Sequence, residues 1–190
     1  MDAKKIVSWL KENHIPSTAH LCLDSRAIQA GDVFVACAGK ASNGHDYIDQ
    51  AIAAGAVAVI QDEGINSVSS VPNLVVPQLR TYLGEVAHEW YGRPSEQMTV
   101  IAVTGTNGKT TTTTLVGEIL KAHYDNIFVV GNIGTPYTQL VRATCEHSYT
   151  VAEISSFPLE TIRSFRPNIS AILNIAPDHL DRHPTLSTYI

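Results

Sequence analysis

The stretch that most constrains the fold is residues 100–114, which read VIAVTGTNGKTTTTT. The apolar, β-branched run from about Met98 predicts a buried strand that stops at Gly105, and residues 109–121 predict a helix. Gly105 and Gly108 lie between the two elements. A glycine loop at this junction lets backbone N–H groups crowd a polyphosphate, and the helix N-terminus adds its positive dipole. We therefore expect a phosphate-binding loop.

The side chains at the end of the loop strengthen this interpretation. Lys109 is placed to reach β- and γ-phosphates, and the Thr110 hydroxyl is placed to hold Mg²⁺. Only two residues separate Gly105 from Gly108, so the common G-x-x-x-x-G-K-[ST] spacing is not met. The alternative is a turn that happens to carry glycine and lysine before a helix. Strand, loop, Lys-Thr pair and helix together favour the phosphate loop.

Composition limits the classes of function. The chain has 190 residues with 44% hydrophobic and 16% charged residues, which is typical of a soluble globular protein. A net charge of −5 gives no basic footprint for nucleic acid, and no apolar run reaches membrane-spanning length. The charged, amphipathic N-terminus is not a signal peptide. Cys22, Cys37 and Cys145 are widely spaced and odd in number, which indicates a reducing compartment. We expect a cytoplasmic protein without nucleic-acid or membrane partners.

Strands and helices alternate along the chain, which predicts an α/β fold. A short amphipathic helix around Ile6 is followed by strands at 33–36, 56–60 and 73–76 and by helices at 47–54 and 78–91. The Gly-, Pro- and polar-rich segment 92–97 reads as a linker, and the pattern then restarts. We therefore predict two domains, 1–91 and 98–190. The second has four strands, at 98–103, 127–130, 149–154 and 170–175.

Polar residues follow the strands of the second domain. In an open parallel sheet the carboxyl ends of the strands form the ligand-binding edge, so these residues should converge. Glu153 ends an otherwise apolar strand, where a lone carboxylate is costly unless it meets a cation, and beside a phosphate loop that cation would be Mg²⁺. The alternative is an edge strand on which Glu153 is solvated. Asn132, between two glycines, can approach a ligand or simply form a turn.

A histidine follows the last strand of the second domain. His179 comes directly after Asp178 and could bind a metal through a neutral ring nitrogen. Asp181 and His183 follow in a polar turn, where exposed surface positions are favoured.

Several of these stretches together resemble the Mur ligase family. TGTNGKTT at 104–111 resembles the ATP loop of the Mur ligases and of their relative folylpolyglutamate synthetase. EISSFPLE at 153–160 and LNIAPDHLDRH at 173–183 resemble the central domain of that family. Upstream, DSR at 24–26, GDVFVA at 31–36 and GHDYI at 44–48 are similar to the uridine-nucleotide-binding domain of the MurE type.

The resemblance implies a reaction and a set of sites. ATP would phosphorylate the terminal carboxylate of a UDP-N-acetylmuramoyl peptide, and the amine of an amino acid would attack the acyl phosphate, with Mg²⁺ required. The fold implied is a small UDP-binding α/β domain followed by the first part of a P-loop parallel-sheet ATPase domain. The residues implied for ATP binding are Gly105, Thr106, Asn107, Gly108, Lys109, Thr110, Thr111 and Asn132. Those implied for catalysis are Lys109, Glu153 and His179, and those implied for Mg²⁺ are Thr110, Glu153 and His179. Those implied for the UDP substrate are Ser25, Lys40, Gly44, His45 and Ser155. Ser25 has an alternative role as a turn cap.

The resemblance is mixed between members of the family. The first half is similar to MurE-type enzymes, which add a diamino acid to UDP-N-acetylmuramoyl-L-Ala-D-Glu, and this is the preferred expectation. Residues 131–134, 155–160 and 174–183 are more similar to the MurD type, which adds D-glutamate. Phe157 also stands where the MurE type usually has histidine after Ser-Ser.

The family pattern continues past Tyr189 to a metal-binding lysine and a third domain that binds the amino acid. The resemblance therefore implies that the 190-residue chain alone lacks ligase activity, binds Mg²⁺-ATP weakly and self-associates, whereas a full-length form is a monomer. Two alternatives stay open. One is a nucleotide-binding module without ligase activity, and the other is an unrelated P-loop switch protein, against which the uridine-domain motifs argue.

Overall fold

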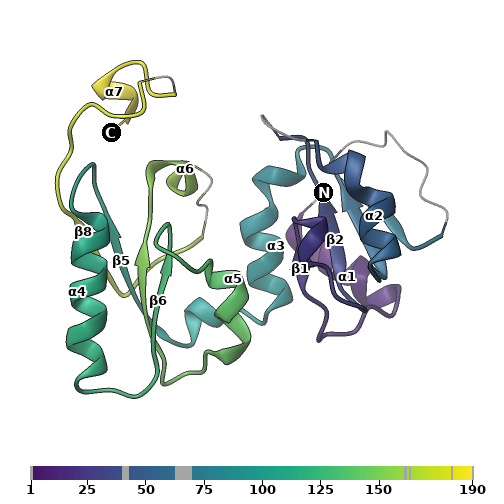
Figure 1. The fold of residues 1–190 in the computed structure, drawn as a ribbon, viewed down its shortest axis with the longest axis horizontal. Coiled ribbons are helices and arrows are strands. Elements are labelled where there is room, and N and C mark those ends of the chain that lie inside the picture. The colour runs from purple at the N-terminus through teal and green to yellow at the C-terminus, as the bar shows by residue number, and fades with distance from the viewer. Residues whose placement is uncertain are drawn as a thin grey trace. The chain divides into compact units, whose positions relative to one another are not determined.

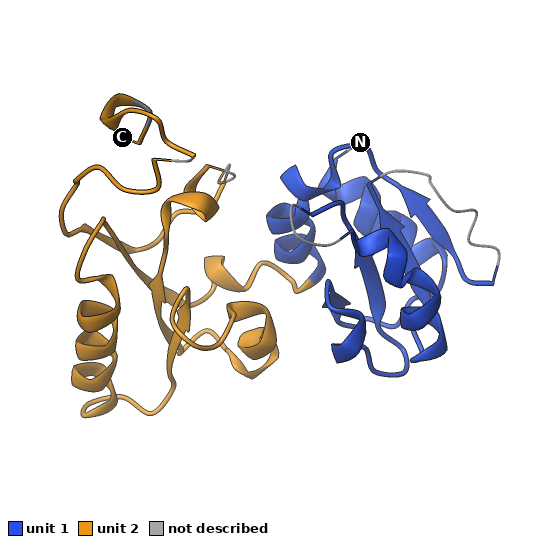
Figure 2. Ribbon diagram, turned by 45° about the horizontal axis from the view of Figure 1, so that its top comes forward, with its two compact units in different colours: residues 1–90 blue, residues 91–190 orange. Residues whose placement is uncertain are grey.

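The computed structural model describes residues 2–39, 43–62, 70–160, 162, 164–180 and 182–189. The chain forms two compact units, Met1–Trp90 and Tyr91–Ile190 (Figure 2). Each unit contains one four-stranded sheet in which every pair of neighbouring strands is parallel. The predicted α/β class with parallel sheets is therefore confirmed.

The sheet of the first unit has the strand order β1-β2-β3-β4. Its strands are β1 (Leu21–Cys22), β2 (Val33–Ala36), β3 (Ala58–Gln61) and β4 (Asn73–Val75). Its helices are α1 (Ala3–Glu12), α2 (Ile48–Ala53) and α3 (Leu83–Trp90), with 3₁₀ turns η1 (Ser25–Ala27), η2 (Gly44–Tyr47) and η3 (Leu79–Thr81).

Both faces of this first sheet are buried, as is usual for parallel strands. Along β2 the side chains alternate, so that Val33 and Val35 join one apolar cluster while Phe34 and Ala36 join another. The first cluster contains the buried stripes of α1 and α3, and the second contains Ile48 and Ala51 of α2. Each face thus has its own layer of helices.

The segment 78–91 forms two elements, although the sequence predicts a single helix. Gln78 adopts a left-handed φ of 59°, which no α-helical residue has. The next turn closes with a 3₁₀ hydrogen bond from Tyr82 N–H to Leu79 O at 2.8 Å. The α-helix proper therefore begins only at Leu83.

The sheet of the second unit has the strand order β6-β7-β5-β8. Its strands are β5 (Thr99–Thr104), β6 (Ile127–Gly131), β7 (Tyr149–Glu153) and β8 (Ile169–Ile172). Its helices are α4 (Lys109–Lys121), α5 (Tyr137–Leu140), α6 (Ser156–Leu159) and α7 (Leu186–Tyr189), with 3₁₀ turns η4 (Pro94–Glu96) and η5 (Val141–Ala143). Figure 1 labels β5, β6 and β8 of this sheet together with helix α4.

Helix α4 has the bounds that the sequence predicts, and it packs on β5, β6 and β7. Its mid-helix glycine is explained by this packing. A Cβ added at Gly117 would lie 2.4 Å from Cγ2 of Val129 on β6, so a side chain there would require Val129 to shift. The close packing holds the start of α4 above the carboxyl end of the sheet.

Strand β8 is shorter than predicted. It ends at Ile172, whereas the apolar pattern extends to residue 175, because the following residues turn away to bond with the loop after β5. Among the described residues, no helix combines the length and the apolar character needed to cross a membrane.

Candidate active site

The loop between β5 and α4 is built around a close backbone approach. Gly105 has a φ of 130°, and a Cβ at this position would lie 2.9 Å from the carbonyl oxygen of Asn174 and 3.0 Å from its nitrogen. Any other residue at 105 would therefore be strained and would push away the segment that follows β8. Gly108, with a φ of 81°, precedes the first residue of α4.

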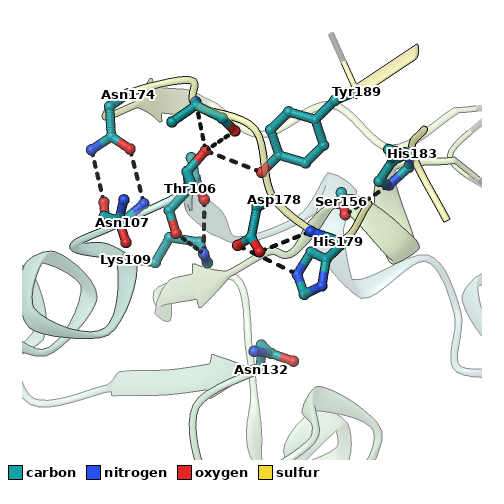
Figure 3. A network of polar contacts seen from close by, with 12 residues as sticks. Thr106, Asn107, Lys109, Asn132, Ser156, Asn174, Asp178, His179, His183 and Tyr189 are labelled. Atoms are coloured by element: carbon teal, nitrogen blue, oxygen red, sulfur yellow. Dashed lines mark hydrogen bonds and ion pairs between the residues drawn. The ribbon is translucent and has the colours of Figure 1, made fainter. Parts of the chain in front are cut away.

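The first half of the loop is hydrogen-bonded to the segment after β8. The carbonyl of Asn174 accepts the Thr106 N–H at 3.1 Å, and Asn174 Oδ1 accepts the Asn107 N–H at 2.8 Å. Asn174 Nδ2 donates to Asn107 O at 2.9 Å. Thr106 Oγ1 accepts the Ala176 N–H at 2.9 Å and lies 3.0 Å from the Ala176 carbonyl (Figure 3).

The second half of the loop keeps its backbone donors available. The first hydrogen bond of α4 runs from Thr112 N–H to Gly108 O at 3.0 Å. No hydrogen bond within the described ranges uses the N–H groups of Gly108, Lys109, Thr110 or Thr111. Four such donors at the positive end of a 13-residue helix are the arrangement with which proteins commonly bind anions, so the predicted phosphate-binding role fits this geometry.

Lys109 folds back over the loop. Its Nζ donates to the carbonyl of Gly105 at 2.7 Å and to that of Thr106 at 3.0 Å (Figure 3). Both acceptors are neutral, and the ion pairs found in the described part of the chain do not include Lys109. Because no carboxylate of the described residues pairs with this ammonium group, it can act as a partner for an anion at the loop.

Glu153 lies in the interior of the sheet, so the alternative of a solvated edge position is wrong. Its strand, β7, lies between β6 and β5, and its side chain is only 4% exposed. Thr110 Oγ1 donates to Glu153 Oε2 at 2.9 Å, and Asn132 Nδ2 lies 3.4 Å from Glu153 Oε1. The structure therefore brings together the carboxylate, the hydroxyl and the amide from three different elements.

The backbone around Glu153 is equally close-packed. The Asn132 N–H donates to Glu153 O at 2.9 Å. Gly131 has a φ of 103°, and a Cβ there would lie only 2.2 Å from the same oxygen. A glycine is thus required for β6 to end against β7 and to deliver Asn132 beside Glu153.

This donor set fits a hard divalent cation such as Mg²⁺. Glu153 is buried, and its partners within the described residues are a hydroxyl and an amide, neither of which neutralises its charge. Mg²⁺ prefers carboxylate, hydroxyl and water oxygens, which Glu153 and Thr110 supply at the mouth of the anion site.

His179 has other neighbours in the structure. It has a φ of 50°, and its N–H donates to Asp178 Oδ1 at 2.8 Å (Figure 3). Its ring lies 4.8 Å from that of Phe157. The structure gives it no contact with Thr110 or Glu153. Nor do the described residues include a group of three or more His, Cys, Asp or Glu side chains arranged to hold a metal. A metal-binding role for His179 stays a prediction.

His183 is buried, so the expectation of an exposed surface position is wrong. It is 6% exposed, and its Nε2 lies 3.2 Å from Ser156 Oγ and 3.6 Å from Glu160 Oε1. Arg182 also pairs with Glu160, and its guanidinium lies 5.1 Å from the centre of the Phe157 ring. The segment containing α6 therefore covers the polar turn. Asp181 lies outside the described residues, and Ser155, two residues after Glu153, is buried.

In the first unit, two predicted substrate contacts are buried. Ser25 Oγ donates to Gln50 Oε1 at 3.2 Å, and the cap of η1 is Asp24, which accepts the Arg26 N–H at 3.0 Å. The turn-cap role therefore belongs to Asp24. His45 is 2% exposed, so its ring is not open to a ligand in this state.

The ring of His45 connects two parts of the first unit. Nδ1 lies 2.6 Å from Asn43 Oδ1, and Nε2 lies 3.0 Å from Asp62 Oδ1, at ion-pair distance although not aligned as a hydrogen bond. Gly44 packs on the backbone of Cys37, where a Cβ would lie 2.8 Å from both N and O. Lys40 lies outside the described residues.

The structure adds two residues, Asp62 and Asn174, to which the sequence analysis assigned no role. Asp62 directly follows β3, and Asn174 follows β8 by two positions. Both could have been found by the rule that already selected Glu153, because each is a polar residue at the carboxyl end of a parallel strand.

Two family models match the chain. The model described as Mur ligase middle domain matches residues 103–190, and the model described as Mur ligase family, catalytic domain, matches residues 18–91.

Curated relatives share one printed name. The UDP-N-acetylmuramoylalanine–D-glutamate ligase of Lachnoclostridium phytofermentans is 67% identical over 91 residues, which are 48% of this chain and 20% of the relative. The ligase of the same name from Thermoanaerobacter pseudethanolicus is 44% identical over 133 residues, 69% of this chain and 28% of the relative. The matched part of the chain thus spans 20% and 28% of the length of these two relatives.

Solved structures match over almost the whole chain. A MurF ligase from Thermotoga maritima in complex with ADP has a TM-score of 0.70 at 27% identity, covering 91% of this chain and 41% of that chain. MurF from Acinetobacter baumannii gives 0.73 at 26%, covering 98% and 44%. A UDP-N-acetylmuramoyl-L-alanyl-D-glutamate–2,6-diaminopimelate ligase gives 0.67 at 26%, covering 90% and 39%.

Proposed function

Because the chain belongs to the Mur ligase family, we propose that it is part of an ATP-dependent ligase that adds D-glutamate to UDP-N-acetylmuramoylalanine in peptidoglycan precursor synthesis. The observation that carries the proposal is the shared name of relatives that are 44–67% identical to it. These relatives correct the sequence-based preference for a diamino-acid ligase of the MurE type. They support the D-glutamate alternative instead.

The geometry of the second unit supports ATP as the phosphoryl donor. The free N–H groups of Gly108–Thr111 and the Lys109 ammonium belong to the same short loop and first helical turn, where they would meet one anion. When a polyphosphate arrives, Lys109 exchanges two neutral carbonyl acceptors for charged oxygens, which are stronger partners. The phosphates would thereby be held in one position for attack, and positioning is the main contribution of a protein to phosphoryl transfer.

Thr110 and Glu153 would hold Mg²⁺ on the same site. The ion would neutralise charge on the phosphate oxygens during transfer. Asn132 would keep Glu153 oriented through its contact with Oε1. We place Ser155 and His179 on the side of the muramoyl substrate, and the UDP moiety on the first unit near Ser25, Lys40, Gly44 and His45, with Ser25 and His45 acting through their buried contacts.

A second candidate is ligation of a diamino acid. It is favoured by the motifs at 24–26 and 44–48, which are similar to the MurE type. It involves the same ATP site and differs in the two substrates.

The test uses the protein encoded by the complete reading frame and compares its activity on the two substrate pairs. One reaction contains UDP-N-acetylmuramoylalanine and D-glutamate, and the other contains UDP-N-acetylmuramoyl-L-Ala-D-Glu and diaminopimelate, each with ATP and Mg²⁺. Phosphate release and product mass are followed. We expect product only with D-glutamate. Product only with diaminopimelate would establish the second candidate, and no product in either reaction would contradict both.

A further inference from the structure

We propose that Asn174 is a positioning residue, which fixes the phosphate loop so that only its second half faces the nucleotide and which holds the Asp178–His179 segment in register with that loop. The inference rests on the proposed function for the identity of the ligand. Its geometry comes from five contacts, here called the Asn174 clamp: three between Asn174 and the backbone of Thr106 and Asn107, and two between Thr106 Oγ1 and Ala176.

In the clamp, the side chain of Asn174 both accepts a hydrogen bond from the backbone of Asn107 and donates one to it. Asn174 Oδ1 accepts from Asn107 N–H and Nδ2 donates to Asn107 O, so the amide of Asn174 pairs with the backbone as a neighbouring strand would (Figure 3). Aspartate could accept but not donate here, and leucine could do neither. The pairing therefore depends on an amide side chain.

The first consequence concerns which backbone N–H groups of the loop remain free to bind an anion. Thr106 and Asn107 give their N–H groups to Asn174, so they are not available to an anion. The free donors begin at Gly108 and continue into the first turn of α4. A loop fixed in this way does not lose conformational freedom when phosphate binds, and this preorganisation favours affinity.

The second consequence concerns the segment that carries His179. Ala176 lies two residues before Asp178. Its N–H donates to Thr106 Oγ1, and its carbonyl oxygen lies within hydrogen-bond distance of the same hydroxyl. Tyr189 OH also lies 3.3 Å from Thr106 Oγ1. The loop and the segment after β8 therefore move as one body for as long as the clamp is closed.

The chain offers a matched control at the opposite end of the same strand pair. Asn168 precedes β8, and its Oδ1 accepts the Val100 N–H at 2.7 Å, while its own N–H donates to Val100 O at 2.9 Å. Asn168 thus joins the β8 segment to β5 with the same chemistry, but at the amino ends of the strands. Both Asn168→Ala and Asn174→Ala remove an exposed amide without opening a core cavity.

The experiment uses the 190-residue chain and three variants, Asn174→Ala, Thr106→Val and Asn168→Ala. Amide hydrogen exchange at Thr106 and Asn107 is measured by NMR without nucleotide, ATP affinity by calorimetry, and unfolding by urea. We expect Asn174→Ala to speed exchange at both amides and to weaken ATP binding about tenfold, the effect of losing one or two hydrogen bonds. Thr106→Val should weaken it similarly. Asn168→Ala should lower the urea midpoint by the same amount as Asn174→Ala does, while leaving ATP affinity unchanged.

Two results would overturn the proposal. One is protected amides at Thr106 and Asn107 in Asn174→Ala, and the other is an equal loss of ATP affinity in Asn168→Ala. If the unmodified chain bound no ATP, the proposed function would fail, and the exchange measurement, which needs no ligand, would still decide the clamp.

Discussion

Glu153 is a buried carboxyl group without a cationic partner among the described residues. It is 4% exposed and accepts from Thr110 Oγ1 within 2.9 Å. Glu153→Gln keeps the size of the side chain and removes the charge. We expect the variant to unfold at a higher urea concentration without Mg²⁺, because an uncompensated buried charge is removed. We also expect Mg²⁺ to stop strengthening ATP binding, as measured by calorimetry with and without the ion.

The matched control for this change is Glu118→Gln. Glu118 lies on the exposed side of α4 and pairs with Lys121 at 2.7 Å in solvent. Its substitution should leave both the urea midpoint and the Mg²⁺ effect unchanged, because exposed ion pairs contribute little. A Glu153→Gln variant that kept the Mg²⁺ effect would remove Glu153 from the proposed metal site.

The three thiols differ in reactivity. Burial, followed by the nearby Asp32 carboxylate, raises the pKa of Cys22 to about 11, and burial raises the pKa of Cys37 to about 11. The Ser148 hydroxyl lowers the pKa of Cys145, which is exposed. A higher pKa means less thiolate at pH 8, and the thiolate is the reactive form.

We therefore expect iodoacetamide at pH 8 to alkylate Cys145 first, as located by peptide mass. Cys22 and Cys37 should become reactive only when urea unfolds the chain or the pH rises toward 11. Early alkylation of Cys37 in the folded protein would contradict this order.

At the scale of elements, the end of β6 depends on a glycine. Gly131→Ala would place a Cβ 2.2 Å from Glu153 O at a φ of 103°. We expect it to lower the free energy of unfolding by about 3 kcal/mol or more, since strain and a backbone clash add. Gly134→Ala is the control, because Gly134 has a φ of 64° and open space around it. It should cost about 1 kcal/mol in the same urea titration.

Elements formed by local patterns could be predicted, whereas those shaped by distant contacts could not. Helix α4 has its predicted bounds because glycine, the Lys-Thr pair and periodicity all act within one stretch. Strand β8 ends three residues early because Asn174 bonds to a loop about 70 residues away in sequence. His183 is buried by Ser156 and Glu160, which precede it by more than 20 residues.

The same distinction applies to the site. The rule that parallel strands end at one edge correctly brought Asn132 to Glu153, and the phosphate-loop pattern added Thr110. The same rule also predicted His179 beside them, whereas the structure places its ring against Phe157. It could not predict which N–H groups of the loop bond to the protein and which stay free for a ligand, because that depends on the hydrogen bonds of Asn174. Nor could it show that Ser25 and His45 are buried, since their partners Gln50 and Asp62 come from other elements.

At the scale of the whole molecule, the first unit has its own core on both faces of its sheet. We expect residues 1–91 to fold alone, with a cooperative thermal transition followed by circular dichroism and a midpoint that rises when UDP is added. UDP would stabilise the fragment by binding only its folded state. A disordered fragment would show that the first unit depends on the second for its stability.

The second unit leaves apolar side chains exposed on its outer strand. Ile169 and Ile172 of β8 are 55% and 67% exposed. An edge strand with exposed isoleucines favours pairing with another chain, so self-association of the 190-residue chain stays a prediction with a physical basis.

We propose that this chain carries the ATP site of a ligase, with Lys109 beside the bound phosphates. Calorimetric titration of the 190-residue chain with ATP and Mg²⁺, beside Lys109→Ala, tests it most directly. We expect the unmodified chain to bind one ATP weakly, and the variant to bind roughly 10 to 100 times more weakly, the loss of one or two charge-assisted hydrogen bonds. Its circular dichroism spectrum and urea midpoint should not change, because the hydrogen bonds of Lys109 Nζ to described residues go to carbonyls of its own loop. Equal ATP affinity in the two proteins, or no binding by either, would contradict the account.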